Sequence, residues 1–92
     1  MNKRLVSYLG GQVTSESGVI DWYDPHKGYG YIRTKNGEEA LLHVTCLRAA
    51  GYLIAKKGAC IEFEALRRPG KDLAAFRILS LEDGWHRNGW LH

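Results

Sequence analysis

Residues 29–44 read YGYIRTKNGEEALLHV, in which an Asn-Gly step separates two short runs of alternating side chains. An Asn-Gly step between such runs is a strong β-hairpin signal, because both residues tolerate the positive φ angles of a tight turn. The stretch therefore predicts a strand over residues 29–34, a turn around residues 35–37, and a second strand over residues 39–44.

The chain on both sides of this hairpin has the same texture of short apolar or alternating runs broken by turn residues. Residues 19–23 predict an earlier strand, which a Pro- and Gly-containing turn over residues 24–28 joins to the hairpin. A longer connection over residues 45–57, with room for one helical turn, leads to a fourth strand from residue 58. A fifth strand follows over residues 73–79. Five short strands with one long connection predict an all-β fold, a small Greek-key barrel.

Length and composition agree with one small globular domain. A chain of 92 residues does not divide into several domains, and its 45% hydrophobic and 25% charged residues are ordinary for a globular protein. No run of roughly 18 apolar residues is present, so we expect no membrane-spanning helix. The apolar run after Lys3 and Arg4 is too short for a signal peptide, which predicts a cytoplasmic protein.

The predicted domain organisation is a barrel over residues 18–81 with an extension at each end. Residues 1–17 form an N-terminal extension, in which residues 15–17 look like a flexible connector, and residues 82–92 form a tryptophan-containing C-terminal tail. The net charge of +3 comes from the middle of the chain, where residues 18–79 include ten basic and seven acidic side chains. A moderate basic excess is compatible with a polyanionic partner.

Cysteine, metal and catalytic patterns are weak in this sequence. Cys46 and Cys60 are too few for the disulfide framework of a small secreted domain, so we expect free thiols in a reducing compartment. His43 and Cys46 form a His-x-x-Cys step, but the paired spacing of a zinc site is absent, so we expect no metal. Glu62 and Glu64 share one strand face with no evident nucleophile or base. We therefore expect neither enzymatic activity nor a cofactor.

The outward face of the hairpin is the candidate binding surface. Side chains alternate with a period of two along a strand, so Tyr29 and Tyr31 share the face opposite the apolar Ile32. The outward face and its turn carry rings, cations and one apolar side chain: Lys27, Tyr29, Tyr31, Arg33, Leu41 and His43. Exposed rings beside cations suit the stacking of unpaired bases and the attraction of phosphates. The alternative is that the Tyr pairs serve only the stability of the sheet.

Several segments of the chain resemble the cold-shock domain family. They read GVIDWY at residues 18–23, KGYGYI at 27–32, LLHVT at 41–45, GACIEFE at 58–64 and AFRI at 75–78. The second of these segments is similar to the family's first ribonucleoprotein motif, and the third resembles its second motif. The resemblance covers residues 18–79 and implies a five-stranded antiparallel Greek-key barrel of the oligonucleotide-binding (OB) type. It also implies binding of single-stranded RNA or DNA by an RNA chaperone or expression regulator.

The resemblance assigns roles residue by residue. Rings match the family's stacking positions at Trp22, Tyr29, Tyr31, His43 and Tyr52. Lys27 matches a lysine that contacts the nucleic-acid backbone. Leu41 stands where the family usually has a stacking Phe, Asp21 where Lys is common, and Val44 where an aromatic residue is common. We therefore expect weaker binding than in a typical member, because each lost stacking ring costs about 1–3 kcal/mol.

Other interpretations stay open from the sequence alone. Strict alternation places Ile20 and Trp22 on one face and predicts a core Trp22, whereas the family match favours a partly exposed ring. Tyr52 lies in the long connection, where its ring could simply anchor the loop. The barrel could also be a scaffold whose extensions, residues 1–17 and 82–92, bind a partner protein or a second copy as a homodimer.

Overall fold

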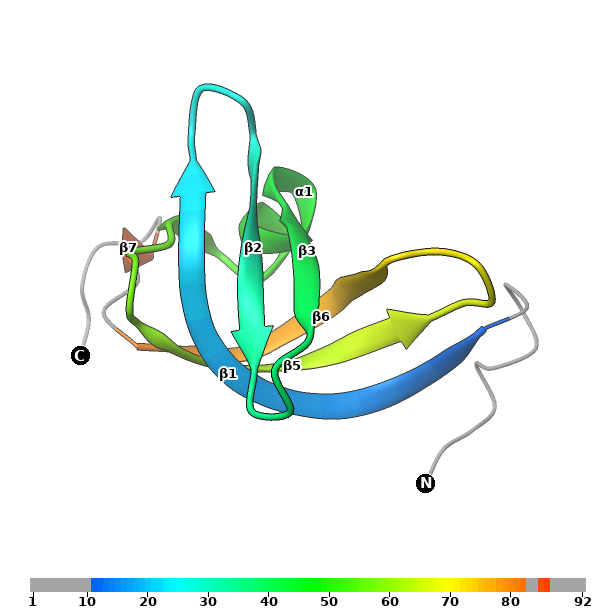
Figure 1. The fold of residues 1–92 in the computed structure, drawn as a ribbon. Helices are drawn as coiled ribbons and strands as arrows, with labels where there is room; N and C mark the ends of the chain where they lie inside the picture. Colours follow the sequence, from blue (N-terminus) through cyan, green and yellow to red (C-terminus); the bar gives the residue numbers. More distant parts are fainter. Residues whose placement is uncertain (1–10, 83–84, 87–92) are drawn as a thin grey trace.

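The computed structural model describes residues 11–82 and 85–86, which form a small barrel of strands with one short helix among them (Figure 1). In chain order the elements are β1 (Gln12–Asp24), β2 (Tyr29–Thr34), β3 (Glu39–His43), α1 (Val44–Ala49), β4 (Tyr52–Ile54), β5 (Cys60–Arg67), β6 (Leu73–Leu81) and β7 (Trp85–His86). The predicted all-β class is therefore confirmed.

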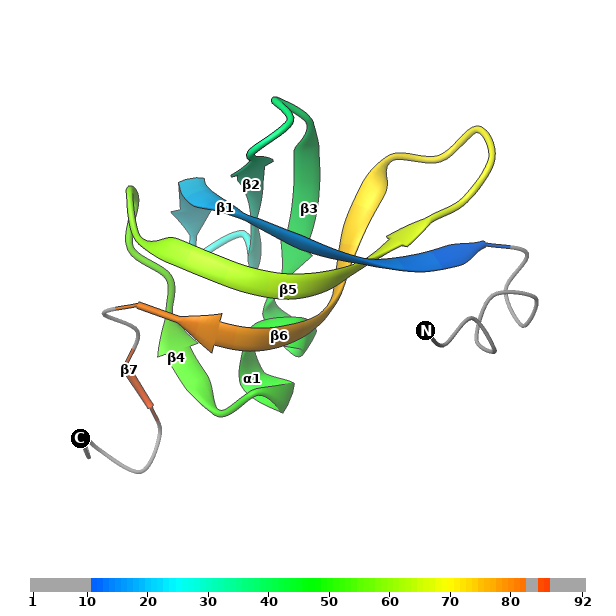
Figure 2. The same cartoon turned by 90° about the horizontal axis from the view of Figure 1, so that it is seen from below.

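Five of these strands close into a barrel in the order β1-β2-β3-β6-β5, which confirms the predicted OB-type barrel. The long, bent β1 pairs with β5 through its first half and with β2 through its second half (Figures 1 and 2). β3 and β6 pair in parallel, through Ala40↔Leu73 and Leu41↔Ala74, whereas the other pairs of the barrel are antiparallel. An odd number of strands cannot close into a ring with every pair antiparallel, so one parallel pair, β3 with β6, closes the predicted antiparallel barrel.

The first strand begins earlier than the sequence indicated. β1 starts at Gln12 rather than at residue 19, and the expected connector at residues 15–17 is wrong. Ser15 lies opposite Glu64 and Ser17 lies opposite Glu62 in the ladder with β5. Serine has little intrinsic preference for strands, so it is the pairing with a distant strand that makes this segment extended.

The predicted hairpin is confirmed in detail. Tyr29 lies opposite His43 and Arg33 lies opposite Glu39, so the Asn-Gly turn sets the register of β2 against β3. Gly37 takes the positive φ of 86° that this turn needs, and Gly28 takes a φ of 77° in the turn before β2.

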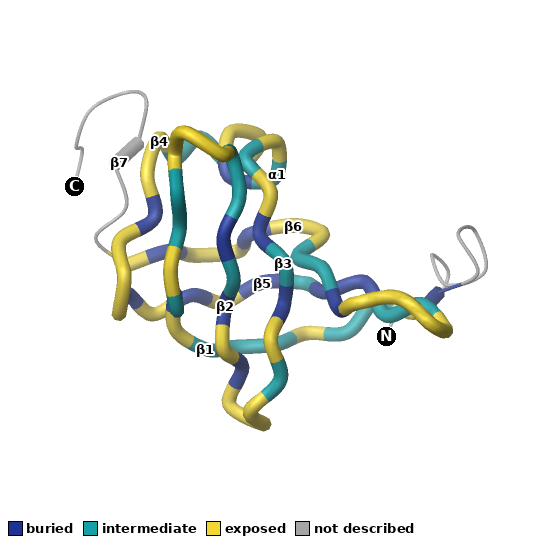
Figure 3. The backbone as a smooth tube through the Cα atoms, turned by 45° about the horizontal axis from the view of Figure 1, so that its top comes forward, coloured by how far each residue is buried: buried dark blue, intermediate teal, exposed yellow. Residues whose placement is uncertain are grey.

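Along β2, β3 and most of β5, buried positions alternate with more exposed ones (Figure 3), and the core is built from apolar side chains at buried positions. Its largest fully buried side chains are Ile20, Ile32, Leu42, Leu47, Ile61 and Phe63. Gly30 lies where β2 approaches β1 closely, because a Cβ atom there would overlap the carbonyl oxygen of Trp22 and lie 2.6 Å from the Cα of Tyr23. The glycine between the two tyrosines of β2 therefore permits the close contact of these strands.

The long connection between β3 and β5 holds more structure than expected. Val44, predicted as the end of a strand, instead begins α1, whose Leu47 is fully buried. β4 follows and pairs with β7 through Tyr52↔His86, a strand pairing that the sequence did not indicate. Within the described part of the chain, no helix is long and apolar enough to cross a membrane.

Candidate nucleic-acid interface

A β-bulge in β1 determines the orientation of Trp22. β1 pairs with β2 through Ile20↔Ile32 and next through Trp22↔Tyr31, so the register shifts at Asp21. The extra residue reverses the alternation after Ile20 and turns the next ring outward. Ile20 is 1% exposed and Trp22 is 36% exposed. Trp22 is therefore a partly exposed ring, and the interpretation as a core residue is wrong.

Three rings, which we call the aromatic face, meet on the outer surface of β1 and β2: Trp22, Tyr29 and Tyr31. The ring centroid of Trp22 lies 5.5 Å from that of Tyr29 and 5.6 Å from that of Tyr31, and the two Tyr centroids are 6.4 Å apart. The rings meet edge to face or tilted, an arrangement that contributes about 0.5–1.5 kcal/mol per pair beyond the area they bury. Each ring therefore supports its neighbours while the group stays open to solvent on one side.

The registers of β1, β2 and β3 arrange the outward side chains in cross-strand rows. The top row holds Asp24, Tyr29 and His43, the middle row holds Trp22, Tyr31 and Leu41, and the bottom row holds Val19, Arg33 and Glu39, with the bulge residue Asp21 beside Arg33. The rings and Leu41 lie in the top and middle rows, whereas the ion pairs of Arg33 with Asp21 and Glu39 lie at the bottom. The outward surface therefore changes from aromatic and apolar to charged between the middle and bottom rows, which are about 7 Å apart along the strand.

The upper end of the aromatic face is bordered by His43 and Lys27. His43 is the N-cap of α1, and its ring nitrogen Nδ1 accepts a hydrogen bond of 3.2 Å from the Thr45 backbone N–H. In the turn before β2, the Asp24 carboxylate accepts hydrogen bonds from the backbone N–H groups of His26 and Lys27, at 2.8 Å and 3.3 Å. Lys27 and His43, both expected to bind nucleic acid, are exposed and stand at the same end of the sheet.

Arg33 lies at the other end, where two carboxylates hold its guanidinium. Its Nη2 atom is 3.3 Å from Asp21 and 3.0 Å from Glu39. The pKa of the Glu39 carboxyl is raised, chiefly because its protonated form donates a hydrogen bond to Asp21, with smaller contributions from desolvation and from the charge of Asp21. Arg33 was expected as a cation for phosphate, but the carboxylates of Asp21 and Glu39, on the same face of the sheet, compensate its charge.

Tyr52 and Leu41 differ from the other expected stacking residues. Tyr52, in β4, is partly buried and packs against the hydrophobic core, as expected of a ring that anchors its loop. Leu41 is half-buried and lies opposite Tyr31 in the middle row. Of the expected rings, the structure therefore brings Trp22, Tyr29 and Tyr31 together in one cluster.

The acidic partners of Arg33 are the feature that the sequence interpretation missed. The signal for Glu39 was present, because counting outward from the Asn-Gly turn places Arg33 opposite Glu39. The signal for Asp21 was weaker, since its position beside Arg33 depends on the bulge in β1.

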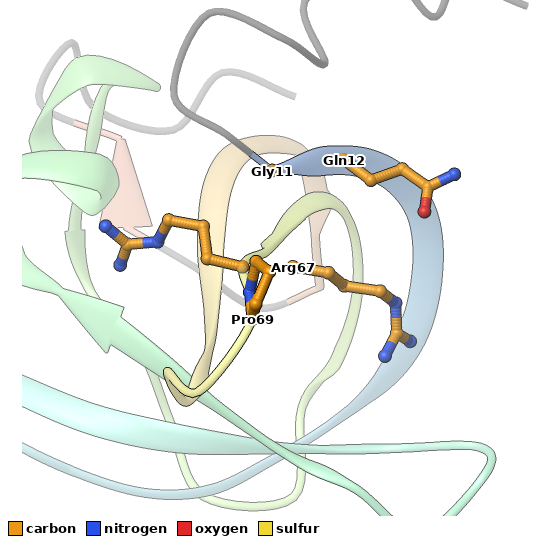
Figure 4. A pocket seen from close by; sticks show the side chains of 5 residues that line it. Gly11, Gln12, Arg67 and Pro69 are labelled. Carbon is orange, nitrogen blue, oxygen red and sulfur yellow. The ribbon is translucent and has the colours of Figure 1, made fainter.

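A second charged group lies away from the aromatic face, where Arg67 binds residues of β1 and of the β2–β3 turn. Its Nη2 atom is 2.9 Å from Glu16 and 2.8 Å from Glu38. A neighbouring pocket of about 400 Å³ is lined by Gly11, Gln12, Arg67, Arg68 and Pro69 (Figure 4). Because Arg67 is held by two carboxylates, this pocket does not offer a free pair of cations.

The described residues contain no cluster of side chains that could ligate a metal ion. No group of three or more His, Cys, Asp or Glu side chains among them is placed to hold a metal ion. Cys46 and Cys60 are free thiols, Cys46 partly buried and Cys60 exposed. Burial raises the pKa of the Cys46 thiol, and a hydrogen bond with Glu82 raises that of Cys60.

The extensions predicted at the two ends fall largely outside the described residues. Residues 1–10 and residues 87–92, with Trp90, lie there, and so does most of the surface expected to form a homodimer. The backbone of Trp85 belongs to β7, which pairs with β4 of the same chain.

A closed five-stranded barrel with exposed rings on its β1–β2 surface is an OB-type domain. No protein-family model matches the chain. The cold shock-like protein of Thermotoga maritima is 34% identical over 47 residues, which are 51% of this chain and 71% of that protein. Cold shock protein CspB of Bacillus caldolyticus is 27% identical over 52 residues, 56% of this chain and 79% of that protein. Cold shock protein CspD of Bacillus subtilis is 29% identical over 49 residues, 53% and 74% of the two chains. The chain belongs to the cold-shock protein family, a family of nucleic-acid-binding barrels.

Proposed function

We propose that this cold-shock protein binds single-stranded RNA or DNA by stacking bases on Trp22, Tyr29 and Tyr31, and that it acts as an RNA chaperone or expression regulator. The observation that carries the proposal is the cluster of these rings, with centroids 5.5–6.4 Å apart, on a solvent-facing part of the sheet. Every base has a π-face, so each ring can contribute about 1–3 kcal/mol without reading sequence.

Lys27 and His43 are the polar groups that we assign to the same interface. Lys27 is exposed at the end of the sheet where Tyr29 begins β2, so its ammonium can approach a phosphate of a strand lying on the rings. His43 lies opposite Tyr29 and adds a flat ring at the top row. Leu41 offers apolar contact only, which supports the expectation of modest affinity.

Chaperone activity follows from differential binding. A protein that binds unpaired strands and not hairpins shifts the RNA folding equilibrium toward the unpaired state by its difference in affinity. We propose the cytoplasm as the compartment, because both cysteines are free thiols.

The test is fluorescence anisotropy of a labelled pyrimidine heptanucleotide, as DNA and as RNA, at two salt concentrations. We expect binding in the micromolar range or tighter that weakens with salt, because bound phosphates release counterions. The variant Tyr29→Ala/Tyr31→Ala should lose this binding, whereas Tyr29→Phe/Tyr31→Phe keeps both rings and should retain it. Circular dichroism melting of each variant checks that the barrel is folded.

The proposal is wrong if the wild-type protein binds neither oligonucleotide at low salt, or if the alanine variant binds as tightly as the wild type. A molecular-beacon hairpin of RNA then tests chaperoning separately. The wild-type protein should open the hairpin in proportion to its single-strand affinity, and the alanine variant should not open it.

A further inference from the structure

The bottom row of the β1–β2–β3 sheet carries more negative than positive charge. Its charged groups are Arg33, Glu39 and the adjoining bulge residue Asp21, which we call the acidic row. Both carboxylates contact the same guanidinium nitrogen of Arg33, at 3.3 Å and 3.0 Å, so one positive charge faces two negative charges. All three side chains are partly solvent-accessible, with 31% to 50% of their surface exposed.

This row lies directly beyond the aromatic face. Arg33 follows Tyr31 by two residues on the same face of β2, about 7 Å further along the strand. Asp21 immediately precedes Trp22 in the bulge of β1, and Glu39 precedes Leu41 by two residues on β3. A single-stranded nucleic acid that stacks on the middle row and continues toward Arg33 must therefore pass over the two carboxylates.

We propose that the acidic row ends the nucleic-acid interface, so that a bound single strand stacks on the top and middle rows and leaves the sheet before Arg33. This inference rests on the nucleic-acid binding proposed above and specifies the length of ligand that the site accepts. A phosphate above the acidic row meets net repulsion, and Arg33 cannot attract it while Asp21 and Glu39 hold the guanidinium. Repulsive groups at the edge of a binding surface limit what binds there as effectively as attractive groups in its centre.

The top of the sheet does not carry this excess of negative charge. Lys27 and His43 stand at that end together with Asp24, whose carboxylate accepts hydrogen bonds from backbone N–H groups of the turn. Among the described residues no carboxylate forms an ion pair with the side chain of Lys27 or His43. The charges of Lys27 and Asp24 therefore balance at the top, whereas the acidic row has two carboxylates for one guanidinium. This difference in charge favours a short ligand that binds over the top and middle rows.

The experiment measures affinity for oligothymidylates of increasing length, by competition against a labelled heptanucleotide. For the wild-type protein, the gain in affinity should level off at about four nucleotides, since the three rings of the aromatic face and the ring of His43 accept about one base each. The variant Asp21→Asn/Glu39→Gln changes the acidic row from net negative to net positive and leaves Arg33 free. Its affinity should keep rising up to eight nucleotides, by about fivefold or more over the wild type, while binding of the shortest ligands stays within about twofold.

Salt dependence provides a second measurement on the same two proteins. Each additional phosphate contact steepens the slope of log K against log salt by about 0.7 for a single strand. The double variant should therefore show a steeper slope than the wild type with the octanucleotide and an equal slope with the trinucleotide.

A matched control separates position from net charge. Glu62→Gln/Glu64→Gln also removes two carboxylates and releases one arginine, since Glu64 pairs with Arg77 at 3.1 Å on β5 and β6. This variant should keep the wild-type dependence on length. An equal gain in the control, or a wild-type affinity that rises to eight nucleotides as steeply as that of Asp21→Asn/Glu39→Gln, overturns the acidic row as a boundary and leaves the proposed binding intact. If no oligonucleotide binds the wild-type protein, the proposed function and this inference are both wrong.

Discussion

The indole of Trp22 lies 5.6 Å from the phenol ring of Tyr31, centroid to centroid, although Trp22 is only two residues away from the fully buried Ile20. The bulge at Asp21 makes this contact possible, because it turns Trp22 to the outer side of β1. The position of the indole beside both tyrosines makes Trp22 the central ring of the aromatic face.

Replacing Trp22 should therefore affect binding more than folding. We expect Trp22→Ala to weaken oligonucleotide binding by about 1–3 kcal/mol, which is about 5- to 150-fold, because one stacking ring is lost. Trp22→Phe keeps a ring and should lose much less. Anisotropy titration measures the affinity and thermal unfolding measures the stability. Equal affinities of the Ala and Phe variants would show that the indole does not stack on bases.

Leu41 offers the opposite experiment, since it occupies the middle row opposite Tyr31 without a ring. We expect Leu41→Phe to strengthen binding, by up to about 1–3 kcal/mol, because it extends the aromatic face across β3. Leu41→Met changes the side chain without adding a ring and serves as the control. Affinity that is unchanged in Leu41→Phe, measured by the same titration, would contradict a stacking role for this row.

The two phenylalanines should differ strongly in their effect on stability. Phe63 is 0% exposed in the core, whereas Phe76 is 42% exposed on β6. We expect Phe63→Ala to lower the free energy of unfolding by about 3–5 kcal/mol, because it removes buried apolar surface and leaves a cavity. Phe76→Ala should cost less than about 1 kcal/mol. Urea unfolding of both variants measures the difference, and similar costs would contradict the described packing.

Arg67 and Arg77 form a similar contrast among the ion pairs. Arg67 contacts Glu16, whose side chain is only 12% exposed, whereas Arg77 is 63% exposed beside Glu64. We expect Arg67→Gln to destabilise the barrel by about 1–3 kcal/mol, because a largely buried carboxylate loses its partner. Arg77→Gln should cost at most about 1 kcal/mol. Urea unfolding at neutral pH measures both costs.

The cost of Arg67→Gln should also depend on pH. The hydrogen bond from Arg67 lowers the pKa of Glu38 below its ordinary value of 4.5 in the folded protein. A lowered folded-state pKa contributes stability above the unfolded-state pKa, and this stability is lost as the pH falls through the folded-state pKa. The difference between wild type and variant should therefore shrink below about pH 4. A difference that grows in acid would contradict this ion pair.

The thiol of Cys60 provides a chemical test of the contact between β5 and the end of β6. The hydrogen bond and charge of Glu82 raise the pKa of this thiol above the usual value of 9.0, so less thiolate is present at a given pH. We expect alkylation of Cys60 by iodoacetamide to require a higher pH than alkylation of a free cysteine. Glu82→Gln should shift the rate profile to lower pH, as mass spectrometry of the modified peptide can measure. An unchanged profile would show that Glu82 does not control the thiol.

The hairpin of β2 and β3 was predictable because its information is local. The Asn-Gly step and the alternation on both sides of it set the register, and Tyr29, Tyr31 and Leu41 then face outward together. The inward face of β5 was predictable for the same reason, since Ile61 and Phe63 alternate with Cys60 and Glu62.

Other features depend on segments that are distant in the sequence. Residues 12–17 became part of β1 because β5 pairs with them, and β4 exists as a strand beside β7. The ion pairs of Arg33 with Asp21 and Glu39 need both the hairpin and the bulge. The strand propensities of the individual residues do not predict these pairings.

Local alternation and turn chemistry therefore determine, before any tertiary contact is known, that the chain forms short strands with rings on one side. The tertiary structure decides which strands close the barrel, which strand pairs with each half of β1, and which way Trp22 points. The physical reason is that a β-strand is completed by partners elsewhere in the chain, and the close approach of β1 to Gly30, together with the bulge at Asp21, exists only after those partners have met.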